Sequence, residues 1–362
     1  MIELDNVYAV VMAGGVGSRF WPKSRKALPK QFLPLLDHQT LIQATCERLR
    51  LFLPVEQILV VSTQSHGAKV RRQLRWLRPQ NHLQEPFGKN TAPCIGLAAV
   101  HLLARSPESV MVVLPADHHI SRSDRFVEAL QSAVLLIRRQ PDALATIGIE
   151  PTFPATGYGY LQRGEPFAFD HQQAFRVRAF AEKPTLEVAE QFFSSGEFLW
   201  NSGIFVWRSQ TILNCLEQWM PDLHAGLMEI SKVLNQRRYP AVLERVYKQI
   251  RSESIDYGVM EKASHVLVLE GDFGWSDVGS WDEVYHCSVQ DEEGNVLLGE
   301  PIVKDVKNCY IESGRRVVAL VGVSDLVVID TNDALLICER KKAQDVKWVV
   351  EKLKHSKKQK YL

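Results

Sequence analysis

The sequence predicts an α/β fold, in which helices cover an open, mostly parallel sheet and a smaller β domain follows. Short apolar runs rich in β-branched residues recur at 8–13, 57–62, 109–114 and 144–149. Longer helical patterns lie between these runs, and such alternation is typical of parallel sheets. From about residue 286, brief β-like runs separated by Gly, Asn and Asp turns replace the alternation, which predicts a second domain.

Each predicted element has its own pattern in the sequence. The four apolar runs are hydrophobic at consecutive positions, as expected for strands that helices bury on both faces. Residues 40–53 carry a helical apolar stripe that begins at Thr40, a plausible N-cap. Residues 90–105 have the small-residue and leucine spacing of a second helix. Residues 343–360 read as an amphipathic helix whose late lysines favour its negative terminus.

Length, charge and apolar runs limit the classes of protein and the kinds of partner that the sequence allows. A length of 362 residues favours one large domain and a smaller one. The net charge of +1 gives no argument for an acidic partner, so any basic site must be local. The first residues lack the pattern of a signal peptide, and no apolar run is long enough for a membrane helix. We therefore expect a cytoplasmic protein with neither a membrane nor a nucleic acid as partner.

Cysteines and histidines do not suggest a transition-metal site. The six cysteines are scattered and form no Cys-x-x-Cys pair, so we expect free thiols in a reducing compartment. His118 and His119 are adjacent, and neighbouring side chains on an extended chain point in opposite directions. A structural or ligand-contacting role is the better interpretation of each.

Unusual polar segments follow the predicted strands directly. The sequences GGVGSR, STQSH and PADHH stand after the first three runs. In open α/β sheets, ligands bind outside the carboxyl ends of the strands. The sequence therefore predicts that several strand ends contribute to one crevice.

The first of these segments has the composition of a phosphate site. Gly14, Gly15 and Gly17 permit positive φ and a close approach to the main chain, whose successive N–H groups can hold phosphate oxygens. Arg19 and Lys30 add positive charge. The alternative is a plain tight turn, which two glycines alone would favour. The arginine and the Pro-Lys-Gln that follow make the phosphate site the better interpretation.

Two common phosphate motifs do not fit this segment. The dinucleotide pattern G-x-G-x-x-G, started at Gly15, would need glycine where Phe20 stands. The Walker pattern would need a lysine after Gly17, where Ser18 stands. A hydride-transferring dehydrogenase is therefore the function that the sequence supports least.

Two aspartates are candidates for a divalent cation. Asp117 lies just beyond the strand at 109–114, where a carboxylate can hold Mg²⁺. One carboxylate makes a weak site, and Asp277, between glycines in GDFGWSDVGSW, is a possible second ligand. From the residues alone the pairing stays open, because most surface aspartates are solvated or cap a helix.

Residues 13–32, AGGVGSRFWPKSRKALPKQF, resemble the signature of the sugar-1-phosphate nucleotidylyltransferases. The Phe-Trp-Pro and Pro-Lys-Gln-Phe spellings are most similar to the mannose-1-phosphate guanylyltransferase branch. The resemblance implies a Rossmann-like, GT-A-like nucleotidyltransferase domain at 1–285. It also implies a small C-terminal domain at 286–362, with a left-handed β-helix fragment and a closing helix, and a homodimer.

Further segments resemble the family in order, at 85–99, 155–161, 180–184, 200–207 and 254–263. The resemblance implies nucleotide contacts for Ala13, Gly14, Gly15, Gly17, Ser18, Lys89, Asn90, Thr91 and Pro93. It implies sugar contacts for Gly157, Tyr158, Glu182 and Asn201. It implies catalytic roles for Arg19, Lys30, Asp117 and Lys183, and a metal held by Asp117 and Asp277. The role of Ser254, Ile255 and Asp256 stays open.

The implied reaction joins GTP and α-D-mannose 1-phosphate to give GDP-mannose and pyrophosphate. An oxygen of the sugar phosphate attacks the α-phosphorus in line, with Mg²⁺ or Mn²⁺ as cofactor. A sister enzyme with another base or sugar, and a non-catalytic paralogue that binds nucleotide sugars, are the alternatives. Longer relatives carry an added phosphomannose isomerase domain, so isomerase activity is not expected here.

Overall fold

The computed structural model describes residues 4–169 and 172–362. The chain divides into two compact units. Unit 1 comprises the residues up to 14, 45–116 and 120–275, and unit 2 comprises 15–44, 117–119 and 276–362. Each unit combines separate stretches of chain, whereas the sequence-based domains at 1–285 and 286–362 are continuous. Those domain limits stay a prediction.

Unit 1 is built on a nine-stranded sheet with the order β3-β2-β1-β4-β9-β6-β10-β8-β7. Strands β1 and β2 run parallel, as do β1 and β4, so that Ala9 lies opposite both Ile58 and Val112. The strands are β1 (Val7–Ala13), β2 (Ile58–Thr63), β3 (His82–Glu85), β4 (Val110–Pro115), β6 (Leu144–Ile149), β7 (Gly159–Phe169), β8 (Gln172–Glu182), β9 (Phe198–Arg208) and β10 (Val266–Gly271).

The predicted α/β class and all four predicted strands, now β1, β2, β4 and β6, are confirmed. The structure adds an antiparallel part to the parallel core. Strand β9 runs antiparallel to β4 and β6, and β7 and β8 form an antiparallel pair. Each of these three strands includes part of a segment that the sequence analysis assigns to the sugar pocket, namely 155–161, 180–184 and 200–207. The sheet is therefore more mixed than predicted.

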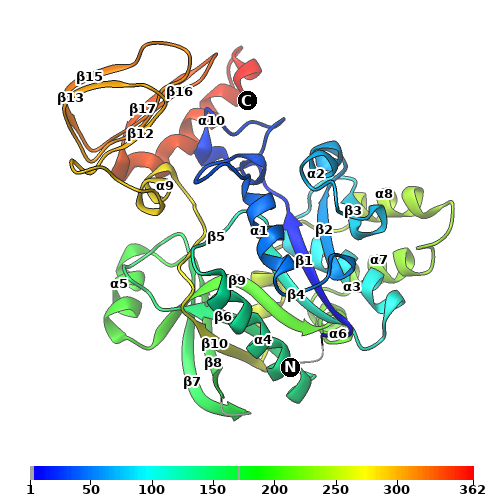
Figure 1. Cartoon of the computed structure of the whole chain (residues 1–362). Helices are drawn as coiled ribbons and strands as arrows, with labels where there is room; N and C mark the ends of the chain where they lie inside the picture. The colour runs from blue at the N-terminus through cyan, green and yellow to red at the C-terminus, as the bar shows by residue number, and fades with distance from the viewer. Residues whose placement is uncertain (1–3, 170–171) are drawn as a thin grey trace. The chain divides into compact units, whose positions relative to one another are not determined.

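Helices cover both faces of this sheet (Figure 1). Helix α3 packs on β1 and β2, and α4 packs on β6, β9 and β10. Buried residues of β1 alternate between the two faces, which explains why the strand is apolar throughout. The helices are α2 (Gly67–Gln73), α3 (Thr91–Arg105), α4 (Ser123–Arg139), α5 (Leu186–Ser195), α6 (Ser209–Trp219), α7 (Pro221–Ser231), α8 (Tyr239–Gln249) and the π-helical turn η6 (Asp256–Met260).

The predicted helices at 40–53 and 90–105 correspond to α1 (Leu41–Arg50) and α3. Thr40 precedes α1 as expected: its carbonyl accepts from the Ala44 N–H at 2.9 Å, and its own N–H donates to Gln43 Oε1 at 3.1 Å. The bond to Gln43 is the returning half of a capping box, which satisfies a main-chain donor at the start of the helix.

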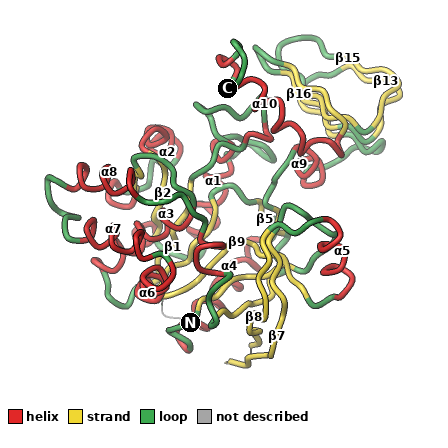
Figure 2. The backbone as a smooth tube through the Cα atoms, turned by 180° about the vertical axis from the view of Figure 1, so that it is seen from behind, coloured by secondary structure: helices red, strands yellow, loops and turns green. Residues whose placement is uncertain are grey.

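Unit 2 contains the stacked short strands predicted for the end of the chain. Strands β12, β14 and β16 form one parallel ladder, and β13 and β15 form another, as expected for a chain that winds in β-helical turns (Figure 2). The elements are β12 (Val296–Leu298), β13 (Ile302–Lys307), β14 (Tyr310–Glu312), β15 (Ala319–Ser324), β16 (Leu326–Asp330), β17 (Leu335–Glu339), α9 (Trp281–Cys287) and α10 (Val346–Lys354). Two short strands, β5 (His119–Ile120) and β11 (Trp275–Ser276), form a separate ladder.

The hydrophobic core of unit 2 joins residues far apart in sequence. Phe20, from the turn η1 (Ser18–Phe20), meets Trp281 of α9 edge to face, with ring centroids 5.3 Å apart. Val346 and Val350 of α10 belong to the same buried cluster. The segment that follows the glycine loop is therefore packed on the C-terminal part of the chain.

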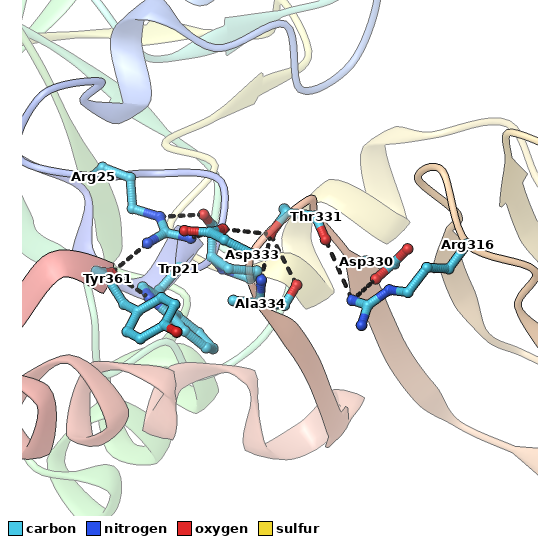
Figure 3. A network of polar contacts seen from close by, with 9 residues as sticks. Trp21, Arg25, Arg316, Asp330, Thr331, Asp333, Ala334 and Tyr361 are labelled. Atoms are coloured by element: carbon cyan, nitrogen blue, oxygen red, sulfur yellow. Dashed lines mark hydrogen bonds and ion pairs between the residues drawn. The ribbon is translucent and has the colours of Figure 1, made fainter. Parts of the chain in front are cut away.

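Polar contacts fix the same segment (Figure 3). The Arg25 guanidinium donates to Asp333 Oδ1 at 2.9 Å and to the Tyr361 carbonyl at 2.5 Å. Trp21 Nε1 donates to that carbonyl at 2.9 Å. Thr331 Oγ1 orders the adjoining turn by donating to the Ala334 carbonyl at 2.8 Å.

The six cysteines are free thiols. Within the described residues, no helix combines the length and the apolar character needed to cross a bilayer.

Candidate active site

The glycine loop presents main-chain N–H groups. Gly15 and Gly17 have φ of 84° and 67°, a region that side chains with a Cβ rarely adopt. The loop's carbonyls are bonded to the protein: that of Gly15 accepts from Gln31, that of Val16 from the Lys30 N–H, and that of Gly17 from Ser24 Oγ at 2.6 Å. In the described part of the chain, no main-chain carbonyl accepts a hydrogen bond from the N–H groups of residues 14–19. These donors are therefore available to an anion.

Lys30 packs directly against the glycine loop at Gly17. A Cβ on Gly17 would come within 2.4 Å of Lys30 Cβ, so only glycine lets the two segments meet. The lysine begins the turn η2 (Lys30–Phe32) and is only 5% exposed. Its Nζ lies 2.9 Å from Asp117 Oδ2 and donates to the Asp277 carbonyl at 2.7 Å. One ammonium thus joins the two predicted metal-binding positions.

The Asp117 carboxylate is held in its charged form. Burial raises its pKa, but the charges of Lys30 and His118 and the hydrogen bond from Lys30 outweigh burial and hold the pKa below its usual value. A charged carboxylate of this kind is a ligand for a hard cation.

Asp277 has a carboxylate oxygen, Oδ1, that is buried and accepts no hydrogen bond from the described residues. An orphaned buried oxygen is costly unless a cation or a water completes it. Beside it, Glu283 accepts the Gly279 N–H at 2.7 Å, and burial, the charge of Asp277 and a side-chain hydrogen bond with Asp277 raise the pKa of Glu283. The charged carboxylate of Asp117 and the orphaned Oδ1 of Asp277 fit a divalent cation.

The loop and the aspartates line one pocket of about 370 Å³ in unit 2. The pocket brings together the predicted residues Gly17, Ser18, Arg19, Lys30, Asp117 and Asp277. Because both cations and carboxylates line it, the pocket suits an anion that binds together with a metal.

A second cluster of predicted residues lies in unit 1, at the ends of β8 and β9. Glu182 and Lys183 form an ion pair, and a Cβ on Gly159 would come within 2.5 Å of Glu182 Oε2. Lys183 has a positive φ of 50°, and its N–H donates to the Tyr158 carbonyl at 3.2 Å. Burial lowers the pKa of Lys183, but the hydrogen bond and the charge of Glu182 raise it by more than burial lowers it. The pKa is therefore above its usual value, and the amine is charged.

Asn201 is buried beside this pair, and its amide orientation is determined. Its Oδ1 accepts from the main-chain N–H of Gly203 at 3.2 Å, so Nδ2 is the side that faces Asp256 Oδ1 at 3.1 Å. The hydroxyl of Thr146 also lies 3.1 Å from Asn201 Oδ1.

Two further sugar-segment residues differ in their surroundings. A Cβ built on Gly157 would have no neighbour within 4 Å, so a ligand could approach its main chain. The Tyr158 ring is buried against Trp200 and Trp275, at centroid distances of 4.9 and 5.2 Å. The ring of Tyr158 is therefore part of the packing, and its carbonyl is the group that orders Lys183.

The predicted nucleotide segment at 89–93 makes structural contacts within unit 1. Lys89 Nζ donates to the Ile250 carbonyl at 2.9 Å, and Asn90 Oδ1 accepts the Thr91 N–H at 2.9 Å as the N-cap of α3. Pro93 is buried in the first turn of α3. The nucleotide contacts expected of these residues stay a prediction.

The sequence leaves the role of the Ser254-Ile255-Asp256 segment open, and the structure shows which residues the segment contacts. The Ile255 N–H donates to Thr91 Oγ1 at 2.8 Å, and the Ala92 N–H donates to the Glu253 carbonyl at 3.2 Å. The segment thus joins the start of α3 to Asn201. Burial and the nearby charge of Glu182 raise the pKa of Asp256 to about 6.

The predicted site residues therefore form two groups, one in each unit. Unit 2 holds Gly15, Gly17, Ser18, Arg19, Lys30, Asp117 and Asp277. Unit 1 holds Ala13, Gly14, Lys89, Asn90, Thr91, Pro93, Gly157, Tyr158, Glu182, Lys183 and Asn201. Sequence reasoning missed Gly159 and Glu283, whose importance depends on contacts that no local pattern reveals.

Comparison with known proteins identifies the family. Residues 8–294 match the nucleotidyl transferase family, and residues 299–353 match the MannoseP isomerase/GMP-like beta-helix domain. The chain belongs to the nucleotidyl transferase family. The predicted family resemblance and the predicted β-helix-like C-terminal part are confirmed.

Curated relatives agree with this assignment. A mannose-1-phosphate guanylyltransferase of Escherichia coli (strain K12) is 43% identical over 97% of this chain and 74% of its own length. One from Klebsiella pneumoniae is 40% identical over 97% of this chain and 75% of its own length. A crystal structure of a mannose-1-phosphate geranyltransferase from Thermus thermophilus is 36% identical, with a TM-score of 0.87 over 96% of this chain and 99% of that one.

Proposed function

We propose that the chain transfers GMP from GTP to α-D-mannose 1-phosphate, giving GDP-mannose and pyrophosphate. The observation that carries the proposal is the glycine loop, whose available N–H groups lie beside Lys30, Asp117 and Asp277. The names of the curated relatives support the choice of guanine and mannose.

The reaction is a displacement at phosphorus. An oxygen of the sugar phosphate forms a bond to the α-phosphorus of the nucleotide. The bond from that phosphorus to the bridging oxygen breaks, and its electron pair leaves with pyrophosphate. Two anions must approach each other, so the protein's task is to position them and offset their charge.

In unit 2 we assign the triphosphate to the N–H groups of the glycine loop, with Arg19 and Lys30 as cations. A unit charge pair at about 4 Å contributes roughly 4 kcal/mol at an effective dielectric near 20. Each ~1.4 kcal/mol gained only in the transition state is a tenfold rate factor. A few such contacts would account for a useful acceleration.

In unit 1 we assign the sugar phosphate to the cluster at the ends of β8 and β9. The Lys183 side chain is 57% exposed and charged, which suits the phosphate of the sugar. Glu182 and Asn201 can accept from and donate to sugar hydroxyls. We assign Gly157 to a close main-chain contact with the ring.

Asp117 and Asp277 would hold a divalent cation, which supplies a positive charge at the phosphate groups when bound. Among the described residues no group of three or more His, Cys, Asp or Glu side chains forms a metal site. Mg²⁺ suits such a pair, because it takes its remaining ligands from waters and phosphates. Mn²⁺ would fit the same oxygens. A homodimer in the cytoplasm is part of the same proposal.

A substrate panel tests the assignment. Pyrophosphate release is measured with GTP, ATP, UTP and dTTP against mannose and glucose 1-phosphates, and the product is identified by mass. We expect GTP with mannose 1-phosphate to give GDP-mannose at the highest rate. A higher rate with another pair would replace the substrates, and binding of GDP-mannose without pyrophosphate release in any pair would indicate a non-catalytic paralogue.

A further inference from the structure

We propose that Lys347, on the C-terminal helix α10, binds the phosphate chain of the nucleotide. Lys347 lines the same pocket as Gly17, Arg19, Lys30, Asp117 and Asp277, and all of these residues belong to unit 2. The inference rests on the proposed function and adds to it a residue that lies far beyond the predicted catalytic domain at 1–285.

The position of Lys347 is determined by its helix. Val346, the residue before it, and Val350, about one helical turn after it, are buried in the cluster that contains Phe20 of η1. Figure 1 shows α10 beside the segment that follows β1. The same segment is tied to the residues after α10, because Trp21 and Arg25 both donate to the Tyr361 carbonyl. The backbone of Lys347 is therefore anchored next to the glycine loop.

The side chain of Lys347 is free to reach a ligand. It is 60% exposed, and Glu351 Oε1, one turn along the helix, lies 3.9 Å from its Nζ. An exposed pair at that distance contributes little, so leaving it costs little. Lys30, by contrast, is buried and bound to Asp117 and Asp277. Lys347 and the exposed Arg19 are thus the mobile cations of the pocket, and Lys30 is the fixed one.

Charge balance favours a ligand of high negative charge. The pocket lining includes the cations Arg19, Lys30 and Lys347 and the carboxylates of Asp117 and Asp277. A divalent cation on the two aspartates would leave a strongly positive pocket. Polyphosphate is the anion class that combines several charges with the acceptor oxygens that N–H groups and ammonium groups bind.

The test compares charge-removing and charge-keeping variants of the full chain. Binding of inorganic pyrophosphate and of GTP, each with Mg²⁺, is measured by calorimetry for wild type, Lys347→Met and Lys347→Arg. Lys354→Met, on the same helix but outside the pocket lining, is the matched control. Because Lys347→Met removes a charged hydrogen bond to phosphate, we expect it to weaken binding about tenfold or more. Lys347→Arg should keep most of the affinity, and Lys354→Met all of it.

Steady-state kinetics separate binding from a structural effect. Lys347→Met should raise KM for the nucleotide and leave both KM for the sugar phosphate and Tm unchanged. Unchanged affinity of Lys347→Met for pyrophosphate and GTP would overturn the proposal, and so would equal losses in both KM values. If Lys347→Met lowers Tm, Lys347→Gln replaces it. Because pyrophosphate binding needs no turnover, a wild type that binds it without transferring GMP would refute the proposed function alone.

Discussion

At the scale of single residues, two glycines of the same loop meet different physical requirements. Gly17 has a positive φ, and its missing Cβ leaves room for Lys30. Gly14 has neither constraint, because a Cβ there would have no protein atom within 4 Å. Gly17 is therefore needed by the fold, and Gly14 by the ligand if phosphates approach the main chain.

Alanine substitutions distinguish these two requirements. Gly17→Ala should lower the free energy of unfolding by about 1–2 kcal/mol from its backbone conformation alone, and the displaced Lys30 should lower activity. Gly14→Ala should leave the unfolding midpoint in urea unchanged and weaken GTP binding in calorimetry. A Gly14→Ala protein with normal GTP affinity would contradict the placement of the phosphates on this loop.

Glu85 makes stability depend on pH. Burial raises the pKa of Glu85 from 4.5 to about 7, and the Tyr247 hydroxyl donates to its Oε1 at 3.2 Å. The folded state therefore holds the proton more tightly than the unfolded state. The resulting contribution to the free energy of unfolding is complete below about pH 4.5 and is lost as pH rises to about 7.

Glu85→Gln should reduce this pH dependence, because the amide keeps the acceptor for Tyr247 and cannot ionise. Between pH 5 and pH 8, the loss of unfolding free energy should shrink by up to about 3 kcal/mol relative to wild type. Urea unfolding at both pH values measures this difference, and Glu187→Gln, at an exposed position of α5, is the control. Equal pH dependence in wild type and Glu85→Gln would rule out a raised pKa at this residue.

At the scale of elements, the sequence predicted strands best where helices cover both faces. The run 8–13 is apolar at each position, and it forms β1. Strand β7 is buried at residues 159–161 and mostly part-exposed or exposed beyond them, so no continuous apolar run marks it in the sequence. The bond from Ile255 to Thr91 joins residues far apart in the chain, and no local pattern predicts such a pairing.

The contact between η6 and β9 predicts a role for Asp256. Asp256→Ala removes the acceptor of the Asn201 amide, so we expect a higher KM for mannose 1-phosphate and little change in KM for GTP. Asp256→Asn keeps an acceptor and should show a smaller effect. Glu253→Gln, just before the Ser254-Ile255-Asp256 segment, serves as the control, because Glu253 bonds Lys89 and Ala92 through its main chain. Equal effects on both KM values would indicate a general structural role instead.

At the scale of the whole molecule, the chain is divided differently from what composition alone predicts. The composition change near residue 286 marks the start of the β-helix-like part, and the family matches change between 294 and 299. Yet residues 15–44 and 117–119 belong to the same compact unit as that part. The fold class, the phosphate loop and the pairing of Asp117 with Asp277 could be proposed from sequence. Lys347 could not, since only packing brings α10 beside the loop.

A metal held by Asp117 can be tested by the rate of pyrophosphate release from GTP and mannose 1-phosphate, measured for wild type and Asp117→Asn across a magnesium titration. Asp124→Asn, an exposed position in the first turn of α4, is the control. We predict a magnesium-dependent rate for wild type and the control, and a rate for Asp117→Asn that falls by orders of magnitude while its circular dichroism and Tm show a folded protein. A near-wild-type rate for Asp117→Asn at each magnesium concentration would rule out a catalytic metal at Asp117.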